Sequence, residues 1–154
     1  MVNLKNRLSL EQIDQKLQKL LVLKNMEVPP KGWINAVRTG LNMSLVQLAK
    51  RLKKTSVSVR EIEEREQNKN ITLNKLIEVG EALELQFVYG FIPKEPSLES
   101  MIEQRALQVA REIVMRSSQS MKLEEQENRG ARLQKAIKDR AELIRQEMPK
   151  YLWD

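Results

Sequence analysis

Residues 43–66 read MSLVQLAKRLKKTSVSVREIEERE, and this stretch decides the fold of the chain. Ser44 is suited to cap a helix, because its hydroxyl can accept a hydrogen bond from a free backbone N–H. The apolar residues that follow have the spacing of one helical face: Leu45, Leu48, Ala49 and Leu52. The stretch therefore begins with an amphipathic helix of about two turns.

A second helix follows after Lys53 and Lys54, with Thr55 or Ser56 as its cap. Val59 and Ile62 lie three residues apart and face inward, and their neighbours point outward. Two short helices joined by a tight turn form a helix-turn-helix, in which the second helix offers its outer face to the DNA major groove. Lys53 stands where this turn usually has Gly, so a left-handed backbone there costs about 1 kcal/mol and suggests a tilted or lengthened turn.

Composition narrows the function classes. The 154 residues carry a net charge of +6, with 41% hydrophobic and only 4% aromatic residues, which argues against a β-sandwich. Residues 32–70 hold eight Lys or Arg against four Glu, so most of the positive excess surrounds the helix-turn-helix and suits a polyanionic partner. The chain has no Cys and no His, which excludes Cys/His zinc sites, thiol nucleophiles and Ser-His-Asp triads. We therefore expect no enzyme, no cofactor and no metal.

The first residues lack the apolar core of a signal peptide, and no apolar run approaches the roughly 20 residues of a membrane helix. These features predict a cytoplasmic, nucleoid-associated protein without a membrane partner.

The predicted organisation has four parts. Residues 1–31 form an N-terminal helical arm, residues 32–83 the helix-turn-helix domain, residues 84–93 a short β-strand and residues 94–154 a helical extension. In the arm, Ser9 and Gln12 read as a capping box, and the helix ends near Asn25, before Pro29 and Pro30. The apolar side of this helix is Ile13, Leu17, Leu20 and Leu21, which either packs on the core or serves as a dimer arm.

In the central domain, the helix after Gly32 has four residues on its predicted buried side: Trp33, Ile34, Val37 and Leu41. A further helix after Thr72 closes a bundle around Trp33. Leu85, Phe87, Tyr89 and Phe91 then alternate with other residues, which is typical of a strand. A lone strand is unstable, and Leu21 to Val28 is only a weak partner. The strand therefore pairs with its own copy in a homodimer, or it is an extended segment packed on the bundle.

The extension contains two helical faces. The first, after Ser97, has Leu98, Ile102, Ala106, Val109 and Ile113, and the second has Leu133, Ile137, Ala141 and Ile144. A polar interruption, Ser117 to Ser120, separates them, and Pro149 ends the second helix. These helices either serve dimerisation and partner binding or enlarge the core.

Base contacts are predicted for five residues of the second helix: Ser56, Val57, Ser58, Arg60 and Glu61. Arg60 can donate to guanine O6 and N7, Glu61 can accept from a cytosine amino group, and Val57 can meet a thymine methyl. Alternatively, Glu61 pairs with Arg65 on a solvated face. Phosphate contacts are predicted for Ser44, Gln47, Lys53, Lys54 and Lys69.

These residues resemble the repressor type of helix-turn-helix called Xre or Cro-like. The run from about Leu8 to Gln126 is also similar to the family named mobile mystery protein A, through Gly32–Ile34, Met43–Leu45, Glu63–Glu66, Ile71–Leu73, Phe87–Tyr89 and Pro93–Lys94. The resemblance implies a mainly α fold, an Xre/Cro-like bundle with one short β-strand and a C-terminal helical extension.

The resemblance also implies a bacterial regulator that binds double-stranded DNA and represses its own operon. Such a regulator is encoded beside a Fic-domain partner and has an antitoxin-like role. By the same resemblance, Arg38 pairs with Glu63, whereas the alternative is two independent surface charges. Ser120 and Glu124 have the Ser-x-x-x-Glu spacing of the inhibitory helix of Fic systems, although Glu125 departs from that pattern, and a polar helix cap is the alternative. The alternative function is a protein-binding inhibitor of a Fic-type toxin, in which the helix-turn-helix is only a scaffold.

Overall fold

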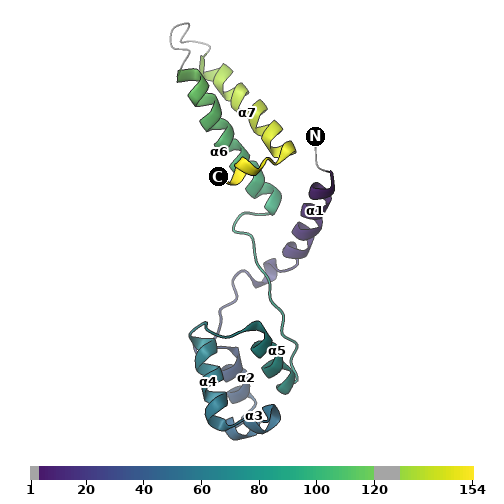
Figure 1. The fold of residues 1–154 in the computed structure, drawn as a ribbon, viewed down its shortest axis with the longest axis vertical. Helices are drawn as coiled ribbons and strands as arrows, with labels where there is room; N and C mark the ends of the chain where they lie inside the picture. The colour runs from purple at the N-terminus through teal and green to yellow at the C-terminus, as the bar shows by residue number, and fades with distance from the viewer. Residues whose placement is uncertain (1–3, 120–128) are drawn as a thin grey trace. The chain divides into compact units, whose positions relative to one another are not determined.

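The computed structural model describes residues 4–119 and 129–154, which form seven α-helices, two short 3-10 helices and no strand (Figure 1). The chain divides into two compact units. The central unit comprises Asn25–Gly90, and the terminal unit comprises Met1–Lys24 together with Phe91–Asp154. The first 24 residues of the predicted arm thus belong to the same unit as the C-terminal helices.

The central unit contains four helices: α2 (Trp33–Gly40), α3 (Leu45–Leu52), α4 (Ser56–Gln67) and α5 (Leu73–Ala82). Ser44, Thr55 and Thr72 begin α3, α4 and α5, and each side chain accepts a hydrogen bond from a backbone N–H three residues on. The core consists of seven buried residues drawn from all four helices: Ile34, Leu48, Ala49, Val59, Ile62, Val79 and Leu83. The predicted apolar faces of α3 and α4 supply four of them.

Two residues of the predicted buried side, Trp33 and Leu41, lie outside the core, contrary to the prediction. Trp33 is 44% exposed and Leu41 is 59% exposed, whereas Ile34 and Arg38 are buried. Because each helical residue turns about 100°, Trp33 points away from the stripe that Ile34 and Arg38 share. Leu41 follows the last residue of α2, so the helix no longer holds it against the core. The bundle therefore closes around Ile34 and not around Trp33.

All four helices of the central unit end in a left-handed residue that is not glycine. Asn42, Lys53, Lys69 and Glu84 have φ between 54° and 59°. At Lys53, the next N–H, from Lys54, donates to the carbonyl of Ala49 at 2.9 Å, which closes the last turn of α3. Thr55 then caps α4 directly, so the turn keeps its ordinary length despite the missing glycine.

The terminal unit is built on a helical hairpin. The helices α6 (Leu98–Gln119) and α7 (Arg129–Glu147) lie side by side (Figure 1). The predicted apolar faces meet there, and Ile102, Ala106, Val109, Ile137 and Ile144 are buried. The 3-10 helix η2 (Lys150–Trp153) follows Pro149 and buries Leu152 completely, whereas Tyr151 and Trp153 are 41% and 55% exposed.

The N-terminal helix α1 (Leu4–Gln18) differs from its predicted form. Ser9 lies within α1, so Ser9 and Gln12 do not begin the helix. The helix ends at Gln18, and a 3-10 helix, η1 (Leu21–Leu23), follows. The helix packs against α6, as one of the two alternatives predicted, although Ile13 is 46% exposed.

Asp14 of α1 caps α6. Its two carboxylate oxygens accept the N–H groups of Leu98 and Glu99 at 2.7 and 3.1 Å, and Ser97 accepts the N–H of Ser100 at 3.0 Å. These bonds satisfy backbone donors that the first turn of a helix leaves free. The negative charge of Asp14 also interacts favourably with the positive end of the helix dipole. No local sequence pattern predicts this long-range cap.

The strand predicted between residues 84 and 93 is absent from the described chain. Leu85 bonds to the carbonyl of Gly80, and residues 86–92 then have no regular secondary structure. The weak partner candidate, Leu21 to Val28, contains η1 instead of a strand. A strand needs a second strand to pair its N–H and C=O groups, and the described part of this single chain supplies none. Within the same residues, no helix has the length and apolar character needed to cross a membrane.

We expect Lys53→Gly to stabilise the central unit by about 1 kcal/mol, because glycine adopts the left-handed conformation without a steric penalty. Urea unfolding followed by Trp33 fluorescence, in a Trp153→Phe background, measures the change. The matched control is Lys50→Gly in the last turn of α3, which should destabilise by about 1 kcal/mol. Equal destabilisation by both substitutions would contradict the account of this turn.

Candidate nucleic-acid interface

The inner side of α4 is anchored in the central unit and its outer side faces solvent. Val59, Ile62 and Glu63 are buried, and Thr55 starts the helix by accepting the N–H of Ser58 at 3.1 Å. The opposite side, which we call the outer face of α4, consists of Val57, Arg60 and Glu61, and all three are exposed. A helix held on one side and free on the other can enter a groove without rearrangement of its own bundle.

The outer face carries side chains that are free to bind. Among the described residues, Arg60 and Glu61 form no ion pair and no side-chain hydrogen bond. The alternative pair between Glu61 and Arg65 is therefore not formed. Val57 is 63% exposed, so its methyl groups are accessible to a partner. Ser56 and Ser58 are half-buried at the start of the helix, where their contact with bases stays a prediction.

A buried ion pair joins α4 to α2. Arg38 Nε donates to Glu63 Oε1 at 2.5 Å, and a second guanidinium nitrogen donates to Oε2 at 3.1 Å. Asn35 also donates to Oε2 at 2.9 Å, and the remaining Arg38 nitrogen donates to the carbonyl of Met43. Arg38 and Glu63 are only 9% and 8% exposed, so the predicted pair is present and the alternative of two independent surface charges does not hold.

This pair makes the stability of the unit depend on pH. Burial raises the pKa of the Glu63 carboxyl, but the hydrogen bonds from Arg38 and Asn35 and the charge of Arg38 outweigh burial and lower it overall. A carboxyl whose folded pKa lies below its unfolded value stabilises the fold above that unfolded value, about 4.3 for Glu. The contribution is lost as the pH falls through the folded pKa.

A second carboxylate of α4 fixes the start of α2. Glu66 accepts the N–H groups of Trp33 and Ile34 at 2.7 and 2.9 Å. The backbone of Gly32 has φ of +86°, and a Cβ at this position would lie 2.7 Å from the carboxyl group of Glu66. Gly32 is thus required both for its conformation and for the close approach of Glu66. The sequence signal was available, since Glu66 follows Glu63 by three residues on the inner side of α4.

The residues predicted to contact phosphates are spread along α3, α4 and the turns that follow them, and do not form one cluster. Ser44 and Gln47 bond to each other in a capping box, so their predicted role competes with a structural one. Lys53 and Lys54 lie at the other end of α3, about 12 Å away along the helix axis. Lys53 is exposed, whereas Lys54 lies 3.9 Å from Glu78. Lys69 is exposed in the left-handed turn that ends α4.

The possible Fic-inhibitory residues, Ser120 and Glu124, lie outside the described residues. The helix that precedes them, α6, continues through Ser117 and Ser118 to Gln119. Contrary to the prediction, these residues do not interrupt the helix.

We expect Arg38→Met to destabilise the central unit by about 3 kcal/mol, because it leaves the Glu63 carboxylate buried without its cation. The double variant Arg38→Met/Glu63→Leu should lose less than the sum of the two single variants. Urea unfolding at neutral pH measures this coupling, and an additive result would contradict the pair. On acidification the wild type should lose stability that the double variant does not lose.

Comparison of the chain with protein-family models, curated proteins and solved structures found no match.

Proposed function

We propose that this chain is a sequence-specific DNA-binding regulator that uses α4 as its recognition helix. The observation that carries the proposal is the outer face of α4. Arg60 and Glu61 are exposed and unpaired in the described chain, while the buried pair of Arg38 and Glu63 anchors the opposite side of the same helix. Freely offered donors and acceptors on a rigid helix are what base recognition in the major groove requires.

The surrounding charge supports the same proposal. Lys50, Arg51, Lys53 and Lys69 are exposed on the helices and turns around α4. Cations at such positions neutralise phosphates and fix the register of a helix on the duplex without reading its sequence. The assignment to an autorepressor and antitoxin-like partner of a Fic-domain protein rests on the resemblance to the mobile mystery protein A family, and DNA binding is the part that the geometry supports.

We expect Arg60→Ala to weaken binding to the upstream DNA of its own gene by about 1–3 kcal/mol and to relax specificity at one base pair. Fluorescence anisotropy against that duplex and an unrelated duplex, over a range of salt concentrations, measures both effects. The matched control is Arg116→Ala, which removes an equally charged, exposed residue of α6.

An equal loss on both duplexes would assign Arg60 to phosphate contact. Weak and equal binding of the wild type to both duplexes would overturn the proposal and direct attention to a protein partner.

We also propose that two copies of the chain pair through residues 85–90. Leu85, Val88 and Tyr89 are 46%, 68% and 70% exposed, and the rings of Phe87 and Tyr89 stack at 5.9 Å. The backbone groups of residues 86–90 have no hydrogen-bond partner within the described chain. Exposed apolar side chains and unpaired backbone together suit pairing of this extended segment with the same segment of a second copy.

The wild type should therefore have twice the mass of one chain at micromolar concentration in sedimentation equilibrium, and Val88→Glu should be monomeric. Val46→Glu, which changes a valine of 65% exposure on α3, is the matched control and should stay dimeric. A monomeric wild type would exclude this pairing.

A further inference from the structure

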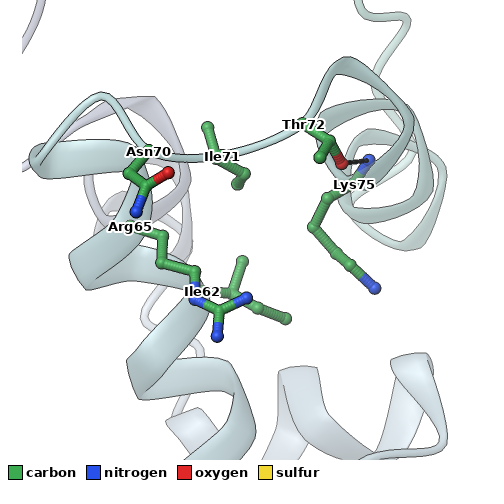
Figure 2. A pocket seen from close by; sticks show the side chains of 6 residues that line it. All are labelled: Ile62, Arg65, Asn70, Ile71, Thr72 and Lys75. Atoms are coloured by element: carbon green, nitrogen blue, oxygen red, sulfur yellow. Dashed lines mark hydrogen bonds between the residues drawn. The ribbon is translucent and has the colours of Figure 1, made fainter.

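A pocket of about 350 Å³ lies between the C-terminal end of α4 and the N-terminal end of α5. The residues that line it are Ile62, Arg65, Asn70, Ile71, Thr72 and Lys75. Figure 2 shows Arg65 extending from α4 and Lys75 from α5 on its two sides, with Ile62 between them.

The charge around this pocket is strongly positive. Lys75 bonds to Glu78 at 2.8 Å, and Lys54 lies 3.9 Å from the other oxygen of the same carboxylate. The hydrogen bond between Lys75 and Glu78 raises the pKa of Lys75 and lowers the pKa of Glu78, and the charge of Arg65 has a smaller, opposite effect on Lys75. Arg65 forms no ion pair within the described chain. Lys75 and Lys54 thus share one carboxylate, and Arg65 has no counter-charge within the described chain.

The frame of the pocket is fixed by backbone bonds. The N–H of Asn70 donates to the backbone carbonyl of Arg65 at 2.8 Å, and the N–H of Lys69 donates to the backbone carbonyl of Glu66 at 3.0 Å. These two bonds set the turn after α4. Thr72 accepts the N–H of Lys75 at 3.1 Å and holds the first turn of α5. These bonds fix the backbone from which the side chains of Arg65, Asn70 and Lys75 extend toward the pocket.

The chemistry of the lining selects the class of ligand. Unpaired and partly paired cations disfavour a cation and gain nothing from an apolar ligand. The Asn70 amide can also donate to an oxyanion, as can the Thr72 hydroxyl, whose oxygen already accepts from Lys75. The apolar side chains of Ile62 and Ile71 lower the local dielectric, which strengthens attraction between the cations and an anion.

We propose that this pocket binds a phosphate oxyanion between Arg65 and Lys75. Two sources supply that chemistry: a backbone phosphate of bound DNA, or a free phosphorylated small molecule. The first source rests on the proposed function, whereas the second does not.

The experiment uses the full chain and two double variants. Arg65→Gln/Lys75→Gln removes both cations of the pocket. Lys138→Gln/Arg140→Gln removes the same two kinds of charge from exposed positions of α7 and is the matched control. Urea unfolding of each variant shows whether the fold is retained.

The first arm titrates inorganic phosphate and records amide shifts by NMR. We expect saturable shifts at Asn70, Thr72 and Lys75 in the wild type and the control, and none in the pocket variant. Saturable shifts at these amides that persist unchanged in the pocket variant would overturn the proposal.

The second arm measures DNA affinity against salt. If DNA supplies the phosphate, the slope of log affinity against log salt falls by about 2 in the pocket variant and not in the control. Phosphate-dependent shifts with an unchanged slope identify a free phosphorylated ligand. Absence of both effects overturns the proposal. A wild type that binds no DNA would overturn the proposed function alone. The phosphate titration would still show whether the pocket binds phosphate.

Discussion

The buried contact between Arg38 and Glu63 is the interaction on which the central unit depends. A guanidinium and a carboxylate taken out of water are costly unless each is fully bonded, and here Asn35 and the carbonyl of Met43 complete the set. With Glu66, which caps α2, the pair places two carboxylates of α4 against α2. The inner side of α4 is therefore polar at its C-terminal half and apolar at Val59 and Ile62. This division fixes the rotation of α4 about its axis, and hence which side chains form its outer face.

The turns of the central unit show how the chain tolerates an unfavourable backbone. Four helices end in left-handed residues, and the three that are Lys or Glu carry a steric penalty that glycine avoids. At two of these turns a lysine remains in the position between helices, where its charge stays exposed. Stability and positive charge are thus in competition at Lys53 and Lys69, which is the kind of local conflict that functional surfaces often contain.

The terminal unit shows why sequence patterns reveal helices better than their partners. The apolar spacing of α6 and α7 predicted the buried face of each helix, because periodicity of 3.6 residues needs no knowledge of the rest of the fold. The cap that Asp14 provides to α6 spans 84 residues of sequence, and no local rule contains it. The same limit applies to the strand, which was inferred from alternation alone although a strand forms only where a second one is present.

The sequence by itself determined the two short helices within residues 43–66, the caps at Ser44 and Thr72, and the apolar faces of α3, α4, α6 and α7, since these follow from spacing and from side-chain chemistry within a few residues. The sequence left the cap of α4 open between Thr55 and Ser56, and the structure has Thr55. The pairing of Arg38 with Glu63 was expected from resemblance. Only the tertiary structure decided that Trp33 is half exposed, that Glu66 caps α2, and that Arg65 and Lys75 border one pocket. These features join residues from different helices, and their geometry depends on how each helix is rotated and where it ends.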